Sequence, residues 1–273
     1  MNLKKLFYIL QKVSPYLAAK LAFYFTSKPI YKKIRPFEKK IIESSDSSTI
    51  LYKNRKIKTY KWGTGNKKAF LIHGWGGRAS NFGAVISELI NHDYEVLSFD
   101  APAHGESSGS TANFFEISDL VKFFLEKENY DLIISHSMGS TFAFTAMNGL
   151  KYQLNKMIVL TSPYQFLEFV NFAKKQFGLT EKTTQLMIDR IQALTTEYNP
   201  STLSVKTLST PINIKKMVLI HDKNDKIISI EKTKMVSSLF ENSLFFEIEG
   251  TGHYKMLWSE KVISIVEHHI LNS

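Results

Sequence analysis

The sequence predicts an α/β protein whose mostly parallel sheet has eight strands and is covered by helices on both faces. Apolar runs of four to six residues, the length of a buried strand, alternate with amphipathic helical patterns from about residue 49 to the end. Such alternation favours parallel strands joined by helical crossovers. The chain has 273 residues, of which 44% are apolar and 13% aromatic, so it can bury one large sheet.

Two short alternating segments begin this pattern, residues 49–52 and 56–62, and the intervening Asn54-Arg55 favours a hairpin. Six apolar runs then predict strands, at residues 69–73, 95–99, 132–135, 157–160, 217–220 and 244–248. Helical patterns predict helices between most of them, near residues 80–90, 113–125, 139–150, 231–239 and 255–270. We therefore expect residues 46–273 to form one domain.

Residues 1–45 are expected to form a basic helical extension. Apolar residues recur there at spacings of three and four, the period of a helix: Leu3, Phe7, Leu10, Val13, Leu17, Leu21 and Tyr24. Ser14-Pro15 interrupts this run as an N-cap followed by a first-turn proline, which predicts two helices at residues 2–13 and 15–26. No apolar run approaches the roughly 18–20 residues that span a bilayer, and the segment is a poor match to a signal peptide.

The positive charge of the chain is concentrated in its N-terminal part. Residues 1–60 contain 14 Lys and Arg against three acidic residues, a net charge of +11, whereas the remaining 213 residues have a net charge of −1. A nucleic-acid-binding domain would carry this charge on its folded body, so no specific nucleic-acid partner is expected. Two interpretations of residues 1–40 stay open. In the first, the helices pack on the body of the protein and leave the lysines solvated. In the second, the helices contact an anionic membrane surface.

Composition narrows the chemistry further. The chain has no cysteine, which excludes disulfides, thiol nucleophiles and Cys-ligated zinc. Its eight histidines show no metal-ligand spacing, so neither a metal nor a cofactor is expected. The Lys-rich, Arg-poor composition suggests a bacterial protein. We expect a cytoplasmic location, which the membrane interpretation places at the inner face of the membrane.

Residues 163–210 form the one long interval without a predicted strand. An apolar stripe at helical spacing predicts a helix there, from Phe166, Phe169, Val170, Ala173 and Phe177. A second helix is predicted from Leu186, Ile188, Ile191 and Leu194. We expect a helical lid inserted between two strands. The phenylalanine stripe either packs in the core or contacts substrate, and a lid over a site would do both.

Ser137 lies between a predicted strand and a predicted helix, at the edge where parallel sheets bind their ligands. Two small residues, Ser135 and Gly139, stand two positions to either side of it. A nucleophile elbow has this requirement, because its tight turn holds the serine in a strained conformation and bulky neighbours would clash with the adjoining helix.

Three further motifs follow predicted strands. His73-Gly74-Trp75-Gly76-Gly77 follows the third strand, Asp100-Ala101-Pro102-Ala103-His104-Gly105-Glu106-Ser107 follows the fourth, and Gly252-His253 follows the last. With the Ser137 turn, these motifs make the chain from about residue 49 to its end resemble the α/β-hydrolase superfamily. The first motif is similar to the oxyanion loop of that family. Ser135 departs from the family pattern, which usually has glycine there.

The resemblance implies a serine hydrolase with a catalytic triad. A serine hydroxyl needs a base within hydrogen-bond reach, and His253 would serve Ser137 in this role. Asp225, in the loop after the predicted strand 217–220, would orient the imidazole. The order Ser137, Asp225, His253 is the order that this fold uses. Asp222, three residues before Asp225, stays open as the alternative acid.

The resemblance also implies an oxyanion hole formed by the backbone N–H groups of Trp75 and Met138. Three other histidines lie in the same loops. We expect His73, His104 and His136 to be structural and to form hydrogen bonds within their own loops.

The implied function is cleavage of a carboxylic ester or thioester through an acyl-enzyme intermediate, with a small, apolar ester or acyl compound as substrate. Serine stands at position 137, where dehalogenases and epoxide hydrolases of this fold have aspartate, which argues against those two activities. Two alternatives stay open. The same triad could transfer an acyl group to another acceptor, or the protein could be a non-catalytic relative that binds a ligand.

Overall fold

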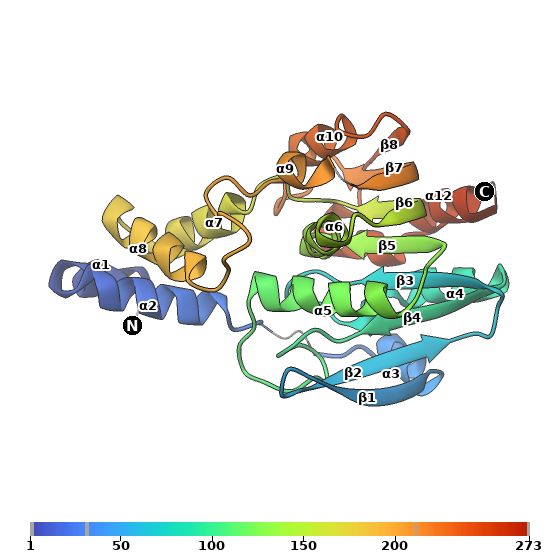
Figure 1. Ribbon diagram of the computed structural model, residues 1–273, viewed down its shortest axis with the longest axis horizontal. Helices are drawn as coiled ribbons and strands as arrows, with labels where there is room; N and C mark the ends of the chain where they lie inside the picture. Colours follow the sequence, from blue (N-terminus) through green and yellow to red (C-terminus); the bar gives the residue numbers. More distant parts are fainter. Residues whose placement is uncertain (1–2, 31–32, 211, 272–273) are drawn as a thin grey trace.

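The computed structural model describes residues 3–30, 33–210 and 212–271 and contains one eight-stranded sheet (Figure 1). Its strands are β1 (Asp46–Tyr52), β2 (Arg55–Trp62), β3 (Lys67–Ile72), β4 (Tyr94–Phe99), β5 (Leu132–His136), β6 (Gln153–Leu160), β7 (Asn213–Asp222) and β8 (Ser243–Ile248). They lie in the order β1-β2-β4-β3-β5-β6-β7-β8. β2 is antiparallel to β1 and β4, and the other pairs are parallel. Residue 2 of the first predicted helix and the basic residue Lys32 lie outside the described residues.

Every predicted strand is present, and the differences lie in their bounds. The hairpin turn is Lys53-Asn54, one residue earlier than predicted, with φ values of 42° and 64°. A two-residue turn with both φ values positive matches the twist of the strands that it joins. β6 and β7 begin several residues before the predicted strands, because their first residues alternate between exposed and buried and form no apolar run.

Helices cover both faces of the sheet, α5 (Phe114–Lys127) and α6 (Met138–Leu150) on one and α4 (Gly83–Asn91) and α12 (Glu260–Leu271) on the other. Successive side chains of a strand point to opposite faces, so each strand contributes to two cores. Phe70 of β3 packs with α5 and α6, whereas Leu71 packs with α4 and α12. The predicted fold class is therefore confirmed.

The remaining helices near the sheet agree with the predictions in part. The helix predicted at 231–239 is α10 (Ile230–Ser237), and the one predicted at 80–90 begins with the 3-10 turn η1 (Ala79–Phe82) before α4. The helix predicted at 255–270 is wrong as a single element, because Ser259 is extended, with φ −82° and ψ 125°. It is divided into α11 (Gly252–Lys255), the 3-10 turn η2 (Met256–Trp258) and α12. A short helix, α3 (Pro36–Glu43), was not predicted from the sequence.

The insertion between β6 and β7 is helical, with α7 (Leu167–Phe177), α8 (Glu181–Gln192) and α9 (Val205–Ser209). The two predicted N-terminal helices are present as α1 (Leu3–Val13) and α2 (Pro15–Thr26). They pack on α7 and α8, and Figure 1 shows these four helices projecting together beyond one end of the sheet. Ser14 caps α2 as predicted, because its hydroxyl accepts a hydrogen bond from the N–H of Leu17 at 3.2 Å.

A buried seam joins α1 to the insertion. The side-chain amide of Gln11 donates to the carbonyl oxygen of Gly178 at 3.0 Å and accepts from the N–H of Thr180 at 2.7 Å. Phe7 is fully buried and stacks on Phe177 with a ring-centroid distance of 4.7 Å. The N-terminal helices therefore pack on the folded body, although on the insertion and not on the sheet.

None of the helices in the described part of the chain is both long enough and apolar enough to cross a bilayer.

The ring of Phe7 should anchor α1. Replacing a fully buried phenylalanine by alanine typically costs about 3–5 kcal/mol, so Phe7→Ala should detach α1 from the insertion. Limited proteolysis with trypsin should then cleave after Lys12 much faster than in the wild type. Ile9→Ala is the matched control, because Ile9 lies on the same helix and is 51% exposed. Equal cleavage rates in Phe7→Ala and the wild type would contradict the anchoring role.

Candidate active site

Ser137 joins β5 to α6, and its backbone has φ 55° and ψ −127°. A residue other than glycine is strained in this conformation and keeps it only because the surrounding structure holds it. The N–H of Ser137 donates to the carbonyl oxygens of Leu160 and Thr161, both at 3.1 Å. A Cβ at Gly139 would lie 2.2 Å from the carbonyl oxygen of Ile72, so this position has no room for a side chain. The geometry is that of the tight, crowded turn expected from the sequence.

The loop after β3 lies directly against this turn. A Cβ at Gly74 would lie 2.8 Å from the carbonyl oxygen of His136 and 2.9 Å from the Cβ of Ser137, so only glycine allows the approach. Trp75, the next residue, lines the same cavity as Met138. Met138 is the first residue of α6, where a backbone N–H has no acceptor within its own helix.

His253 and Asp225 form a hydrogen-bonded pair. Nδ1 of His253 lies 2.7 Å from Oδ2 of Asp225, and the two side chains are only 5% and 1% exposed. Oδ1 of Asp225 accepts from the N–H groups of Ile227 and Ile228 at 2.7 and 3.0 Å. Burial favours the neutral carboxyl, but His253 and these N–H groups outweigh it and lower the pKa of Asp225. An ionised carboxylate fixes the imidazole proton on Nδ1, which leaves Nε2 of the neutral ring as a proton acceptor.

Ser137 and His253 line one cavity, named here the polar cavity, which has a volume of about 150 Å³ and opens to solvent. It lies at the carboxyl ends of the parallel strands, where β5 gives way to α6 and where the chain continues past β8. The structure thus brings the predicted nucleophile and base to one cavity, with Asp225 on the imidazole nitrogen that faces the protein interior.

Asp222, the alternative acid, binds backbone and not the imidazole. Its Oδ2 accepts from the N–H and hydroxyl groups of Thr251 and from the N–H of Gly252, and its Oδ1 accepts from the N–H of Asn224 at 2.8 Å. Burial raises the pKa of Asp222, but these hydrogen bonds together outweigh it and lower the pKa. Asp222 therefore holds the loop that leads into His253.

His136 does not bond within its own loop, so that expectation is wrong. Its Nε2 donates to the carbonyl oxygen of His253 at 2.9 Å, and the two rings lie 4.9 Å apart. Burial lowers the pKa of His136 to about 3, so the ring is neutral. A neutral ring that donates through Nε2 ties the loop of His253 to the serine turn.

His73 likewise joins two loops. Its Nδ1 donates to the carbonyl oxygen of Gly74 at 2.8 Å, within its own loop, but its Nε2 accepts from the N–H of Ala101 at 3.0 Å, in the loop after β4. Burial lowers the pKa of His73 to about 4, which keeps Nε2 available as an acceptor. His104 bonds to the carbonyl oxygen of Pro102 within its own loop, as expected.

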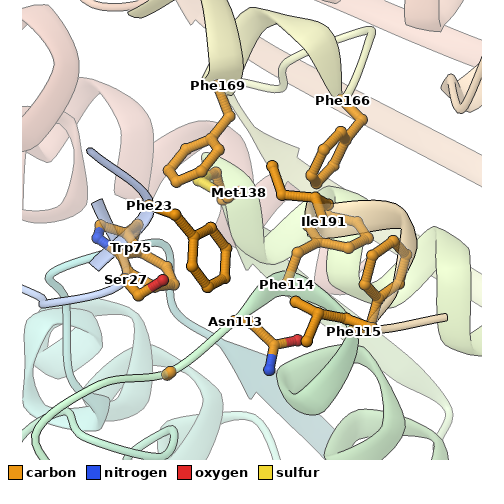
Figure 2. Close-up of a pocket in the computed structure, with 12 residues that line it drawn as sticks. Phe23, Ser27, Trp75, Asn113, Phe114, Phe115, Met138, Phe166, Phe169 and Ile191 are labelled. Atoms are coloured by element: carbon orange, nitrogen blue, oxygen red, sulfur yellow. The ribbon is translucent and has the colours of Figure 1, made fainter. Parts of the chain in front are cut away.

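A second, apolar cavity, with a volume of about 20 Å³, shares Trp75 with the polar cavity. Figure 2 shows aromatic rings from α2, from the start of α5 and from the insertion converging around it. Its apolar lining is Phe23, Trp75, Ala112, Phe114, Phe115, Met138, Phe166, Phe169, Ile191 and Leu194. The predicted phenylalanine stripe therefore divides in two. Phe166 and Phe169 line this cavity, whereas Val170, Ala173 and Phe177 are buried in the core.

Two segments that line the apolar cavity were not predicted from the sequence. Phe23 and Ser27 come from the end of α2, and Phe23 lies off the apolar stripe that predicted this helix. Phe114 and Phe115 begin α5, and an aromatic pair directly after a motif-bearing loop was an available signal. Three cationic residues that line the polar cavity were also not predicted as site residues: Lys33, Arg35 and Arg78.

Among the described residues, one cluster could supply metal ligands. Glu88, His92 and Glu267 have side-chain ligand atoms within 4.8 Å of one another. Glu88 lies on α4, His92 directly after it and Glu267 on α12, on the opposite face of the sheet from α5 and α6, and these residues line neither cavity.

Residues 65–235 match the family model described as serine aminopeptidase, S33. This range includes the loop of Trp75, the turn of Ser137 and the loop of Asp225, whereas His253 lies beyond it. The comparison with curated proteins finds no match.

Solved structures of α/β hydrolases share the fold at low sequence identity. A candidate lipase from Acinetobacter baumannii AYE is 20% identical, with a TM-score of 0.65 over 88% of this chain and 98% of its own. The esterase Pf2001 of Pyrococcus furiosus is 19% identical, with a TM-score of 0.64 over 90% and 96%. A membrane phospholipase A, described as a bacterial virulence factor, is 13% identical, with a TM-score of 0.64 over 86% and 88%.

Asp222 should stabilise the fold in a pH-dependent way. Its pKa is lowered in the folded state, so its contribution is complete above the ordinary aspartate value of about 3.9 and is lost as the pH falls through the folded value. Asp222→Asn should therefore lower the melting temperature at pH 7, and the difference from the wild type should shrink below about pH 4.

Calorimetry between about pH 3 and pH 7 measures this difference. Asp119→Asn is the control, because Asp119 is a half-exposed partner of Lys53 and should contribute less than about 1 kcal/mol. If the melting temperature of Asp222→Asn lies as far below that of the wild type at pH 3 as at pH 7, Asp222 does not hold the loop as an ionised carboxylate.

Proposed function

Because this chain belongs to the serine aminopeptidase S33 family of α/β hydrolases, we propose that it cleaves carboxylic esters or thioesters with Ser137, His253 and Asp225 as its catalytic triad. One observation carries the proposal. The imidazole of His253 is hydrogen-bonded through Nδ1 to a buried carboxylate, at 2.7 Å, beside a cavity that it shares with a serine in a strained turn.

The proposed reaction has two halves. Ser137 attacks the acyl carbon while Nε2 of His253 takes the hydroxyl proton, and Asp225 stabilises the imidazolium that forms. The N–H groups of Trp75 and Met138 would bind the oxyanion, each lowering the barrier by roughly 3 kcal/mol. His253 returns its proton to the leaving alcohol or thiol. Water, activated by the same base, then releases the acid from the acyl-enzyme.

The apolar cavity lies on the side of the site where the acyl group of the substrate would bind. It begins at Trp75 and Met138, the two residues assigned to the oxyanion hole, and its other walls are almost entirely apolar (Figure 2). Two walls, Phe166 and Phe169, belong to the insertion, which in this proposal acts as a lid. Phe23, another residue that lines this cavity, comes from α2, so the N-terminal extension would complete the substrate site.

Esters are favoured over peptides by the charge of the polar cavity. An aminopeptidase must bind the cationic amino group of its substrate. Among the described residues that line the polar cavity, Lys33, Arg35 and Arg78 are cationic and only Glu38 is acidic. Such a surface repels an amino group.

Replacement of the nucleophile tests the proposal. A fluorophosphonate probe should label the wild type and fail to label Ser137→Ala. Hydrolysis of p-nitrophenyl esters should fall on the order of 10⁴-fold or more in the same variant, because the members of a triad act as a unit. Labelling that persists in Ser137→Ala would place the nucleophile elsewhere.

The two aspartates provide an internal comparison in the same assay. Asp225→Asn should lower kcat by about 10⁴-fold, since an amide cannot hold the required imidazole tautomer. Asp222→Asn should retain most of the activity at temperatures below its own unfolding transition. If Asp222→Asn lost activity and Asp225→Asn retained it, Asp222 and not Asp225 would be the acid of the triad.

The same extension has the surface of a membrane-binding element, and we include peripheral contact with an anionic bilayer in the proposal. Large apolar side chains are exposed along α1, α2 and the segment that follows: Leu3, Tyr8, Ile9, Val13, Tyr16, Leu17, Tyr24 and Ile30. Residues 3–30 contain five lysines and no acidic residue. Exposed apolar side chains among lysines match an anionic lipid surface in both polarity and charge.

Vesicle sedimentation tests this contact with the full chain. The wild type should pellet with vesicles that contain an anionic lipid at low salt, less so at about 1 M salt, and weakly with zwitterionic vesicles. The double variant Ile9→Ser, Val13→Ser should lose most of the binding, since both side chains are more than half exposed and their loss should not unfold α1. Failure of the wild type to bind anionic vesicles at low salt would end this part of the proposal.

A further inference from the structure

Thr161, the residue directly after β6, has a strained backbone. Its φ is 57°, and it is the one β-branched residue among the described non-glycine residues with positive φ. A β-branched residue in this region is an outlier that persists only where its surroundings hold it, and such outliers are concentrated at functional sites. Thr161 is also fully buried. Its contacts therefore indicate what the strain maintains.

The strand order places Thr161 between the nucleophile and the acid. β6 lies between β5, which leads into Ser137, and β7, which leads into the loop of Asp225. These three strands are parallel, so their carboxyl ends lie at the same edge of the sheet. A residue at the end of the middle strand can contact both neighbours.

The main chain of Thr161 holds the serine turn. Its carbonyl oxygen accepts a hydrogen bond from the N–H of Ser137 at 3.1 Å. Its own N–H donates to the carbonyl oxygen of Ile220 in β7 at 2.9 Å. The backbone of Thr161 thus links the turn of the nucleophile to the strand that carries the acid.

The side chain of Thr161 lies against the acid. Its Oγ1 lies 3.5 Å from Oδ2 of Asp225, the oxygen that binds Nδ1 of His253. The same Oγ1 lies 2.9 Å from Nδ1 of His221, and Nε2 of His221 lies 3.7 Å from Oδ2 of Asp225. Backbone N–H groups hold the other oxygen, Oδ1. Thr161 and His221 are therefore the side chains beside the oxygen that faces His253.

His221 supports this arrangement as a neutral ring. It is fully buried, and burial lowers its pKa more than the charge of Asp225 raises it. Its Nε2 donates to the carbonyl oxygen of Ile228 at 3.1 Å, which leaves Nδ1 as an acceptor beside the hydroxyls of Thr161 and Thr233 at 2.9 and 2.7 Å. The N–H of Ile228 binds Oδ1 of Asp225, so the ring also supports the loop that holds the acid.

We propose that Thr161, supported by His221, is a positioning residue that sets the separation between the nucleophile and the acid across β6. This inference rests on the proposed triad. A carboxylate that shifts or rotates no longer holds the imidazole toward the serine, and a displacement of about 1 Å can lower a rate by about 10²-fold. Neither residue lines the polar or the apolar cavity, so both act on the substrate only through the triad.

Removal of one hydroxyl tests the assignment. Thr161→Val keeps the β-branched shape and removes the group beside Asp225. Its kcat for p-nitrophenyl esters should fall by about 10- to 100-fold, while KM stays within about twofold. Thr161→Ser keeps the hydroxyl and lacks only the methyl group, so its kcat should stay within about threefold of the wild type.

Thr145→Val is the matched control. Thr145 is buried on α6, and its hydroxyl donates to the carbonyl oxygen of Thr141 within the same helix at 2.8 Å, so kcat should not change. A merely structural role of Thr161 predicts that Thr161→Ser, which loses a fully buried methyl group, loses activity together with Thr161→Val and in proportion to a lower melting temperature. That outcome, or a wild-type kcat in folded Thr161→Val, overturns the inference.

His221 is tested from the other side of Asp225. His221→Leu removes both ring nitrogens, so kcat should fall by about 10- to 100-fold with little change in KM. His221→Gln offers an N–H donor and an oxygen acceptor and should recover most of this loss. A wild-type kcat in His221→Leu would contradict the supporting role of the ring.

Fluorophosphonate labelling supplies a readout that is independent of the true substrate. The rate constant of labelling should fall in Thr161→Val in parallel with kcat, whereas the fraction labelled at the end of the reaction should stay close to that of the wild type. A lower final fraction at an unchanged rate would indicate partial unfolding and contradict the inference. Absence of any Ser137-dependent labelling or hydrolysis in the wild type would remove the proposed function itself. Ser137-dependent activity that Thr161→Val leaves unchanged would remove only this inference.

Discussion

The strained turn at Ser137 is the constraint on which the rest of the site depends. A serine at φ 55° must be held by its surroundings. Here the N–H of Ser137 is bonded to the carbonyl oxygens of Leu160 in β6 and of the residue after it, and glycines at 74 and 139 allow the end of β3 and its following loop to approach the turn within contact distance. Because this turn lies where three loops meet, its geometry also determines where Trp75, Met138 and His253 can be.

Buried neutral histidines connect those loops. His136 joins the serine turn to the backbone of His253, and His73 joins the loop of Trp75 to the loop after β4. Burial keeps both rings neutral, so each uses its ring nitrogens for fixed hydrogen bonds and not for proton transfer. The site therefore separates two roles that one residue type can perform. His253 is bonded to the carboxylate of Asp225, whereas these two histidines hold the loops around the cavity.

The two cavities divide the surroundings of Ser137 by polarity. Trp75 lines both, with aromatic rings on one side and cationic side chains on the other. Neither cavity belongs to the sheet domain alone. Phe23 of α2 closes the apolar cavity, and Arg35, at the start of α3, lines the polar one. The basic N-terminal segment is thus part of the site as well as a candidate membrane surface, which couples the two parts of the proposed function.

The sequence alone determined the features that depend on local spacing. Alternating strand and helix patterns predicted all eight strands, and small residues around Ser137 predicted its turn, because both follow from the chemistry of neighbouring residues. Contacts between distant segments were decided only by the tertiary structure. It placed Asp225 on the imidazole and Asp222, three residues earlier, on backbone N–H groups. It also brought Phe23 and Arg35 to the cavities, since no local pattern specifies which distant surface a helix will meet.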